Sequence, residues 1–154
     1  GVWIGYRGQT SSAGHRARAA MEGVTLGMNY GLNRLRKLGL QPTQIRATGG
    51  GARSKIWRQI MADVFNAEVV TLKIAEGAAY GAALQALWSW RRQQGEDVSI
   101  ESITDRLVKI AARETTYPKA ENVKVYQDLQ ALQDKAATAL KGVFADHRAM
   151  TISC

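Results

Sequence analysis

Residues 48–54 read Thr-Gly-Gly-Gly-Ala-Arg-Ser and lie between a short strand-like run, residues 44–47, and a helix-like run, residues 56–65. Three consecutive glycines remove every side chain from this turn, so a flat ligand could lie directly on the backbone. The N–H groups at the start of the following helix would then be near its phosphate or ribose. A bare triple glycine is equally compatible with a plain tight turn. The neighbouring sequence must decide between these two interpretations.

Two common phosphate-binding motifs are excluded at this turn. A Walker loop requires a glycine and a lysine directly before the serine, whereas here Lys55 follows Ser54. The dinucleotide fingerprint is nearly met by Gly49 and Gly51, but a serine occupies the position of its third glycine. The next strand-like run ends in Lys73 and not in an acidic residue. A Rossmann dehydrogenase is therefore not indicated.

Apolar periodicity predicts helices that alternate with strands. An amphipathic helix over residues 14–38 is closed by Gly39, and its stripe comprises Ala17, Met21, Val24, Met28, Leu32, Leu35 and Leu38. The other expected elements are strands over residues 44–48 and 68–72 and helices over residues 54–65, 76–92 and 100–111. This order indicates an α/β fold with a partly parallel sheet.

The end of the chain is expected to form one more helix. Its apolar stripe runs from Val125 to Val143 and is expected to pack across the core of the chain. Within helix 76–92, Gly77 and Gly81 are expected to allow a close approach to the sheet. Residues 146–154 show no pattern and are expected to form a loose tail.

Residues 49–63, GGGARSKIWRQIMAD, closely resemble the adenosine-binding segment of the FGGY carbohydrate kinases and match the xylulokinases best. Three further blocks resemble that family in the right order, and the likeness covers about residues 1 to 140. These blocks are a strand and long helix at residues 1–5 and 15–24, a glycine/alanine helix at residues 76–83, and Tyr117-Pro118 followed by Tyr126.

The resemblance implies a ribonuclease-H-like fold of the actin-type ATPases. Residues 1–154 would then be the C-terminal, nucleotide-binding domain of such a kinase. On this interpretation the chain is a fragment that lacks the first strands of its domain and the whole N-terminal sugar-binding domain. Its sheet would expose an edge, which favours self-association, including a homodimer, or pairing with the missing segment.

The resemblance also implies a site and a reaction. The residues expected at the nucleotide are Gly49, Gly50, Gly51, Ala52, Ser54 and Lys55. ATP and Mg²⁺ would phosphorylate a pentulose, D-xylulose to D-xylulose 5-phosphate, with ribulokinase, gluconokinase and glycerol-kinase activities as alternatives. The general base is expected outside this chain, because Asp63 and Glu76 are expected to have structural functions. The chain alone is therefore expected to be inactive.

The net charge of +8 is unevenly distributed. Residues 1–58 carry ten basic residues and one acidic residue. A nucleic-acid-binding or scaffold module is the alternative from another class, and it predicts a continuous basic face over residues 14–58. No aromatic residues are interleaved with these cations as stacking platforms, so a nucleic-acid partner is not expected.

The numbers of cysteine and histidine residues argue against disulfide-stabilised and metal-binding proteins. The single cysteine, Cys154, offers no disulfide framework and fits a reducing cytoplasm. With only His15 and His147, no metal site is expected within the chain. The longest apolar run, residues 77–90, is interrupted by polar residues and is too short to span a bilayer, so no membrane partner is expected.

Overall fold

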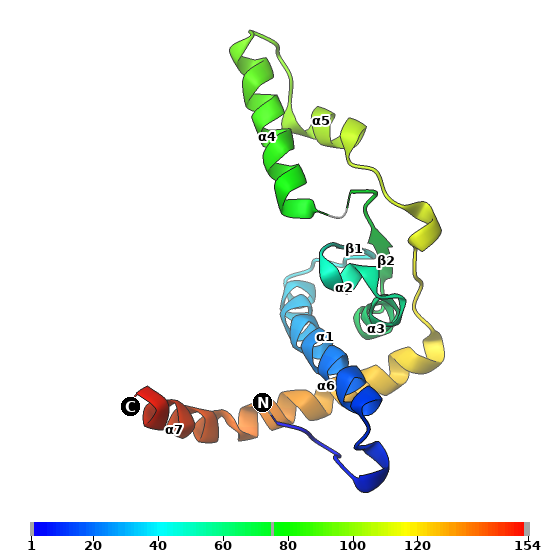
Figure 1. The fold of residues 1–154 in the computed structure, drawn as a ribbon, viewed down its shortest axis with the longest axis vertical. Coiled ribbons are helices and arrows are strands. Elements are labelled where there is room, and N and C mark those ends of the chain that lie inside the picture. The colour runs from blue at the N-terminus through cyan, green and yellow to red at the C-terminus, as the bar shows by residue number, and fades with distance from the viewer. Residues whose placement is uncertain (1, 75, 153–154) are drawn as a thin grey trace. The chain divides into compact units, whose positions relative to one another are not determined.

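The computed structural model describes residues 2–74 and 76–152 of the chain (Figure 1). Two compact units can be distinguished, and each is treated by itself. The helical unit comprises Gly1–Gln41, Asp63–Phe65 and Lys119–Cys154. The sheet unit comprises Pro42–Ala62 and Asn66–Pro118. The last two residues of the expected tail, Ser153 and Cys154, lie outside the described residues.

The sheet unit is built on two parallel strands, β1 (Gln44–Ala47) and β2 (Glu68–Thr71), paired in register from Gln44 opposite Glu68 to Ala47 opposite Thr71. Between the two strands the chain forms α2 (Gly50–Arg53) and α3 (Lys55–Phe65). The last three residues of α3 belong to the helical unit. This strand–turn–helix–strand order confirms the α/β prediction and the predicted positions of both strands to within a residue.

The two strands differ in how their outer edges are covered. On its far side, β2 forms an antiparallel bridge through Val69 to Thr116, and Leu72, directly after β2, forms a second one to Ile110. Within the described part of the chain, no residue pairs with the outer edge of β1. The structure therefore leaves one open sheet edge, as the sequence predicts.

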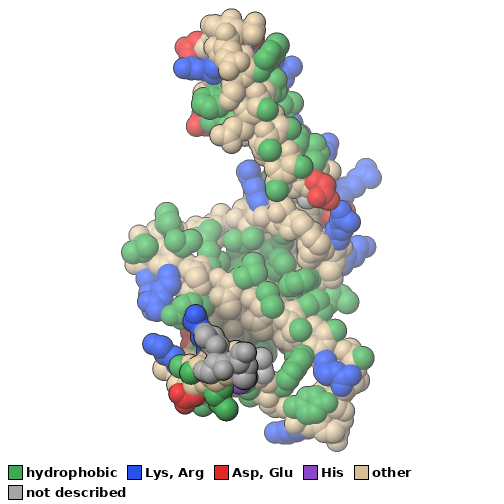
Figure 2. All heavy atoms as spheres, turned by 60° about the vertical axis from the view of Figure 1, so that its left-hand side comes forward, with side chains coloured by type: hydrophobic (Ala, Val, Ile, Leu, Met, Phe, Trp, Pro, Cys, Tyr) green, Lys and Arg blue, Asp and Glu red, His purple; other side chains and the backbone are tan. Residues whose placement is uncertain are grey.

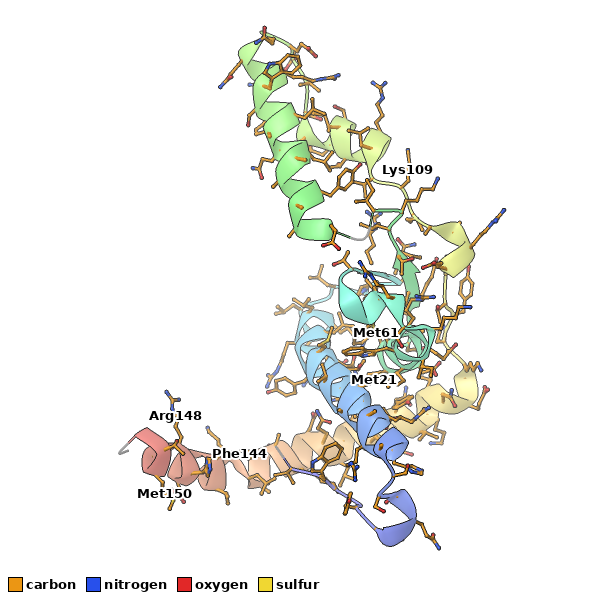
Figure 3. All side chains as sticks on the ribbon, in the orientation of Figure 1. Met21, Met61, Lys109, Phe144, Arg148 and Met150 are labelled. Atoms are coloured by element: carbon orange, nitrogen blue, oxygen red, sulfur yellow. The ribbon has the colours of Figure 1, made fainter. Side chains whose placement is uncertain are left out.

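The core of the sheet unit is apolar. Ile60 and Met61 from α3 are buried together with Val69 and Val70 from β2, and Met61 is labelled in Figure 3. Because alternate residues of a strand face opposite sides, the burial of both Val69 and Val70 shows that β2 is covered on both faces. Ile60 and Met61 therefore belong to the inner face of α3.

Two further helices complete the sheet unit, α4 (Gly77–Gln93) and α5 (Ile100–Leu107). They lie side by side (Figure 1), and the hydroxyl of Tyr80 donates a hydrogen bond of 2.9 Å to the carbonyl of Leu107. The helix predicted over residues 100–111 ends earlier, at Leu107. Residues 109–111 instead pair with the end of β2 and the residues directly after it. A short 3-10 helix, η2 (Ala112–Glu114), follows.

The close approach expected at Gly77 and Gly81 is found at only one of them. A Cβ at Gly77 would lie 3.4 Å from the side chain of Thr48, directly after β1. A Cβ at Gly81 would meet no described heavy atom within 4 Å. The expectation for Gly81 is therefore wrong.

The helical unit contains η1 (Gly8–Thr10), α1 (Ala13–Lys37), α6 (Ala120–Ala139) and α7 (Lys141–Ile152). Residues 2–5, expected to form a strand, are not in one. No described segment pairs with them, and an unpaired strand leaves its backbone hydrogen bonds unmade.

The ends of α1 agree with the sequence analysis. The hydroxyl of Ser12 accepts a hydrogen bond of 3.3 Å from the backbone N–H of His15 and so caps the N-terminus. Gly39 follows the C-terminus with a φ of 90°, and Leu40 N–H donates to the carbonyl of Leu35. This arrangement is a Schellman motif, which requires glycine at its left-handed position.

The predicted inner face of α1 is largely wrong. Val24, Met28, Leu35 and Leu38 of the expected stripe are exposed. The buried residues of α1 are Thr25, Leu26 and Asn29, which lie on another face of the helix. Exposed hydrophobic side chains are also visible over much of the surface drawn in Figure 2. Polar contacts with α6, described below, decide which side of α1 is covered.

The predicted packing of the last helix is also corrected. Val125, Leu132 and Val143 are exposed, whereas Tyr126 and Gln130 are the buried residues of α6. Two helices, α6 and α7, replace the single expected helix, and α7 extends through residue 152 into the segment without a recognised pattern. Its described side chains, including Phe144, Arg148 and Met150 in Figure 3, are exposed.

Candidate functional site

A hollow of about 320 Å³ lies in the sheet unit where the two strands end. It is lined by Ala47, Thr48, Gly49, Ala52, Arg53, Lys55, Arg58, Thr71, Leu72, Lys73, Ile74, Ala111 and Glu114. The lining residues thus include the segments that directly follow β1 and β2. In open α/β sheets, ligands bind outside the carboxyl ends of parallel strands, which is where this hollow lies.

The glycine-rich turn forms one wall of the hollow. Gly49 has a φ of 80° and a ψ of −168°, a conformation that residues with a Cβ rarely adopt. Ala47 and Ala52 add only methyl groups to the lining. The wall is therefore mostly backbone and small apolar surface, which suits a flat ligand.

Basic side chains dominate the charge of the hollow. Arg53, Lys55, Arg58 and Lys73 line it, against one lining carboxylate, Glu114. Arg53 forms an ion pair of 3.2 Å with Glu76, and both side chains are mostly exposed to solvent. Such an exposed pair contributes little to stability. The excess of positive charge favours an anionic ligand.

One cation, Arg58, is buried beside the hollow and is only 5% exposed. Its Nη1 donates a hydrogen bond to the backbone carbonyl of Ala52 and lies 3.7 Å from Oε2 of Glu114. The same Oε2 accepts a hydrogen bond of 2.9 Å from the hydroxyl of Thr71. Arg58 and Glu114 thereby connect the end of α2 to β2.

The structure separates the six residues predicted to bind the nucleotide into two groups. Gly49, Ala52 and Lys55 line the hollow, and Gly50, Gly51 and Ser54 are not among its lining residues. Contact of any of the six with a nucleotide remains a prediction.

Ser54 and Gly51 have structural functions of their own. The Ser54 hydroxyl accepts a hydrogen bond of 3.3 Å from the backbone N–H of Trp57 and caps α3. A Cβ at Gly51 would lie 3.1 Å from the Trp57 ring, so a side chain there would require that ring to shift by a few tenths of an ångström, and packing favours glycine. A triple glycine can thus combine one residue needed for its φ angle, Gly49, with one favoured by close packing.

Sequence reasoning missed several lining residues, among them Arg58, Thr71, Lys73 and Glu114. A signal was available for Lys73, because it comes directly after the predicted second strand and strand ends meet at one edge of a parallel sheet. Glu114 reaches the hollow through the bridges between residues 110–116 and β2. No local motif marks that pairing.

The two acidic residues considered as catalytic candidates are both engaged elsewhere. Asp63 is 2% exposed, and its carboxylate accepts hydrogen bonds of 2.8 Å from the backbone N–H of Lys119 and the side-chain amide of Asn122. It therefore fixes the start of α6. Glu76 is at the N-cap of α4 and pairs with Arg53. That the general base lies outside this chain remains a prediction.

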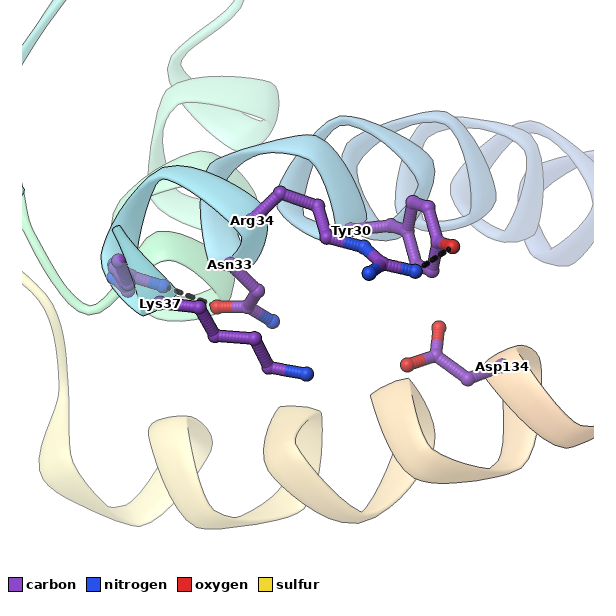
Figure 4. A pocket seen from close by; sticks show the side chains of 6 residues that line it. Tyr30, Asn33, Arg34, Lys37 and Asp134 are labelled. Carbon is purple, nitrogen blue, oxygen red and sulfur yellow. Dashed lines mark hydrogen bonds between the residues drawn. The ribbon is translucent and has the colours of Figure 1, made fainter. Parts of the chain in front are cut away.

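A second hollow, of about 370 Å³, lies in the helical unit and is shown in Figure 4. The guanidinium of Arg34 lies 5.0 Å from the centre of the Tyr30 ring and donates a 2.6 Å hydrogen bond to its hydroxyl. Lys37 and Asp134 lie across the opening and contribute opposite charges (Figure 4). Three cations and one carboxylate line this hollow, but it has no glycine-rich backbone wall on which a base could lie.

Neither a metal cluster nor a membrane helix is found where the chain is described. Among residues 2–74 and 76–152, no three His, Cys, Asp or Glu side chains are grouped so that they could hold a metal ion. In the same ranges, no helix is sufficiently long and apolar to cross a membrane.

The fold agrees with the comparisons with known proteins. Residues 1–90 match the C-terminal domain of the FGGY family of carbohydrate kinases, which is more than half of the chain. The chain therefore belongs to this family. The expected fold is confirmed by the crystal structure of ligand-bound xylulose kinase from Lactobacillus acidophilus, with a TM-score of 0.79 over 95% of this chain and 28% of that one, at 24% identity.

Sequence relatives point to particular members of the family. The chain is 42% identical to xylulose kinase of Haemophilus influenzae over 111 residues, 72% of this chain and 22% of the relative. It is also 34% identical to gluconokinase of Bacillus licheniformis over 131 residues, 84% of this chain and 24% of the relative. The chain thus spans about a quarter of the length of the curated relatives that it matches.

Proposed function

We propose that this chain is the nucleotide-binding part of an ATP-dependent sugar kinase and that the hollow at the ends of β1 and β2 holds the adenosine of ATP. The observation that carries the proposal is the coincidence of two independent features. The turn that resembles the family's adenosine-binding segment, through Gly49 and Ala52, also lines the hollow at the carboxyl ends of the parallel strands.

The lining residues fit the chemistry of ATP. The backbone of Gly49 and the methyl groups of Ala47 and Ala52 offer a flat, weakly polar surface for the base. Lys55 and Lys73 supply positive charge for a polyphosphate. Because the described residues hold no metal cluster, we propose that Mg²⁺ is bound by the ATP phosphates together with groups outside this chain.

For the sugar, we propose a pentulose. In the full-length protein, the γ-phosphoryl group of ATP would pass to a hydroxyl of D-xylulose, yielding ADP and D-xylulose 5-phosphate. The similarity to a xylulose kinase at 42% identity supports this choice. The 34% identity to a gluconokinase supports gluconate as the second candidate.

We further propose that the 154-residue chain alone does not phosphorylate a sugar. Phosphoryl transfer requires the acceptor hydroxyl, the metal and the nucleotide to be brought into line. The acids nearest the site in sequence, Asp63 and Glu76, are engaged in structural contacts.

A single cysteine and the use of ATP support a cytoplasmic location. The open edge of β1 supports association with a second copy or another segment.

The nucleic-acid alternative has less support. It requires a continuous basic face over residues 14–58, but several cations in this range are engaged within the chain. Arg18 pairs with Glu22, Arg36 donates to Asn29 and Asn33, and Arg58 is buried. These residues have less freedom to contact phosphates.

The test is a titration of the purified chain with ATP–Mg²⁺ and with a random DNA duplex at two salt concentrations. Saturable ATP binding with weak duplex binding supports the kinase proposal. Duplex binding that dominates and falls steeply with salt would favour the alternative.

Gly50 offers the sharpest variant for this titration. A Cβ at Gly50 meets no described heavy atom within 4 Å, so Gly50→Val should not disturb the fold through a clash. If adenosine lies on this backbone, as the resemblance implies, the valine will weaken ATP binding. Gly81→Val is the matched control, because that position is equally open but lies in α4 and not in the glycine-rich turn. Equal ATP affinity in both variants would contradict contact between the nucleotide and Gly50. Gly51→Val is unsuitable, since its side chain would displace Trp57 whatever the ligand does.

A further inference from the structure

Arg58 occupies an unusual position for a charged residue. It lies in the first turns of α3, between the glycine-rich turn and β2, and its side chain is almost completely buried. Its partners are the carbonyl of Ala52 and, at 3.7 Å, the carboxylate of Glu114. No described residue accepts a hydrogen bond from its Nε, although that atom is buried.

Stability alone does not account for this arrangement. A buried guanidinium loses its hydration, and the carboxylate that faces it is itself 53% exposed and therefore partly screened. The unpaired Nε adds a further cost. An apolar side chain of similar volume would often be at least as stable at such a position. Departures of this kind from good packing concentrate at functional sites.

The contacts of Arg58 converge on the hollow. Arg58, Ala52, Thr71 and Glu114 all line it, and they form one chain of contacts. The hydroxyl of Thr71 donates to Oε2 of Glu114, this carboxylate faces the guanidinium of Arg58, and the guanidinium donates to the carbonyl of Ala52. The carbonyl at its end belongs to the glycine-rich turn.

The backbone of the turn is held by weak hydrogen bonds. Ala52 N–H donates to the carbonyl of Gly49 and Ser54 N–H donates to the carbonyl of Gly51, both at 3.2 Å. Glycine-rich backbone loses more conformational entropy on ordering than any other backbone. A turn that had to become ordered when the ligand binds would therefore reduce the affinity for that ligand.

We propose that Arg58 is a positioning residue that holds residues 49–53 in the shape that receives adenosine. Glu114, itself held by Thr71, orients the guanidinium toward the carbonyl of Ala52. Arg58 thus acts through the turn and does not itself contact the nucleotide. This inference rests on the proposed function for its ligand, but the ordering of the turn is independent of any nucleotide.

The test compares Arg58→Met and Arg58→Lys with the control Arg92→Met in the full 154-residue chain. Arg92 is an exposed residue of α4 whose only described ion pair is with Asp97, at 3.4 Å. Amide hydrogen exchange over residues 49–54 is measured without nucleotide, and ATP–Mg²⁺ affinity and melting temperature are measured on the same samples.

We expect Arg58→Met to melt within about 2 °C of the parent, because a buried charge is replaced by an apolar group of similar length. Exchange over residues 49–54 should accelerate on the order of tenfold, and ATP affinity should fall on the order of tenfold. For exchange and ATP affinity, Arg58→Lys should lie between the parent and Arg58→Met. An ammonium can donate to the carbonyl of Ala52 but lacks the planar fork that also faces Glu114. Arg92→Met should match the parent in all three measurements.

Two results would overturn the inference. One is unchanged exchange over residues 49–54 in Arg58→Met. The other is a general acceleration over the whole sheet unit together with a large fall in melting temperature, which would make Arg58 an ordinary structural residue. If Arg58→Met does not fold, Glu114→Gln decides, since Glu114 is half exposed and its loss should leave the fold intact. Local acceleration at the turn in Glu114→Gln supports the inference, and its absence contradicts it.

Failure of the proposed function would look different. In that case the parent chain itself would show no saturable ATP binding, while the exchange data would still report whether Arg58 orders the turn.

Discussion

The interior of each of the two units is held together by its own kind of contact. In the sheet unit, the most deeply buried side chains are apolar and come from α3 and β2, with Ile60, Val69 and Val70 almost inaccessible. In the helical unit, α1 and α6 meet largely through polar side chains. The Asn29 side-chain amide donates a 3.0 Å hydrogen bond to Gln130, and the Tyr126 hydroxyl donates one of 2.8 Å to Glu22.

This difference explains where each unit obtains its specificity. Apolar burial is strong but undirected, so the sheet unit owes its register to β pairing and its stability to area removed from water. The polar contacts of the helical unit contribute less free energy each, but an unpaired buried group costs more than a satisfied one gains. Asn29, Gln130 and Tyr126 therefore fix the face on which α1 and α6 meet, and most of the apolar stripe of α1 stays exposed.

The largest expected effect is in the apolar core. Ile60→Ala should lower the free energy of unfolding by about 3 kcal/mol, because the side chain is buried and its removal leaves a cavity. Met28→Ala in α1 is the matched control, since that side chain is 51% exposed and should cost less than about 0.5 kcal/mol. Chemical denaturation of both variants measures the difference. Similar losses in the two variants would show that the stripe of α1 is covered in solution.

The difference between apolar packing in the sheet unit and polar packing in the helical unit also limits how much of the fold the sequence could predict. The C-terminal end of α1 was predictable because it depends on a local signal, Gly39. The strands were predictable because β-branched residues such as Val69 and Val70 cluster between turns. The inner faces of α1 and α6 were not predictable, because apolar periodicity does not show which polar residues will pair across an interface.

A similar limit applies to the candidate site. Its glycine-rich wall could be predicted from residues 49–52 because three glycines have local meaning. Arg58 and Glu114 could not be predicted, since they meet only when residues 110–116 pair with β2. A lone arginine in a helix is most often a solvated side chain. Only the tertiary structure shows that this one is buried.

The second largest effect is expected where α1 and α6 are bridged by amides. Gln130 accepts from Asn29 and donates a 2.8 Å hydrogen bond to Asp134. Gln130→Ala leaves the amide of Asn29 buried without this acceptor, which should cost about 2 kcal/mol. Gln133→Ala is a control, because its only described hydrogen bond is a longer one of 3.3 Å to the carbonyl of Gly23. Denaturant midpoints would test the ranking, and a larger loss in the control would contradict the bridging function of Gln130.

Tyr126 makes the polar contact sensitive to alkaline pH. Burial, together with the hydrogen bond to Glu22, raises the pKa of Tyr126 to about 12 from the ordinary value of 10.0. Because the folded pKa is the higher one, the neutral phenol stabilises the fold fully below pH 10, and this contribution is lost as the pH rises toward 12. Tyr126→Phe should therefore show a weaker decline of unfolding free energy between these pH values than the parent does. An equal decline would assign the effect to other groups.

The smallest effect should be found on the exposed stripe of α6. The sequence predicts that Leu132→Asp places a charge in packed core and costs about 3 kcal/mol or more. In the structure Leu132 is 48% exposed, so the carboxylate stays hydrated and the change should alter the free energy of unfolding by no more than about 0.5 kcal/mol. Leu26→Asp, at a buried position of α1, is the positive control and should destabilise the chain strongly. A large loss in both variants would mean that Leu132 is covered in solution by a surface that the described residues do not supply, and dilution of the sample would then show whether that surface is a second copy of the chain.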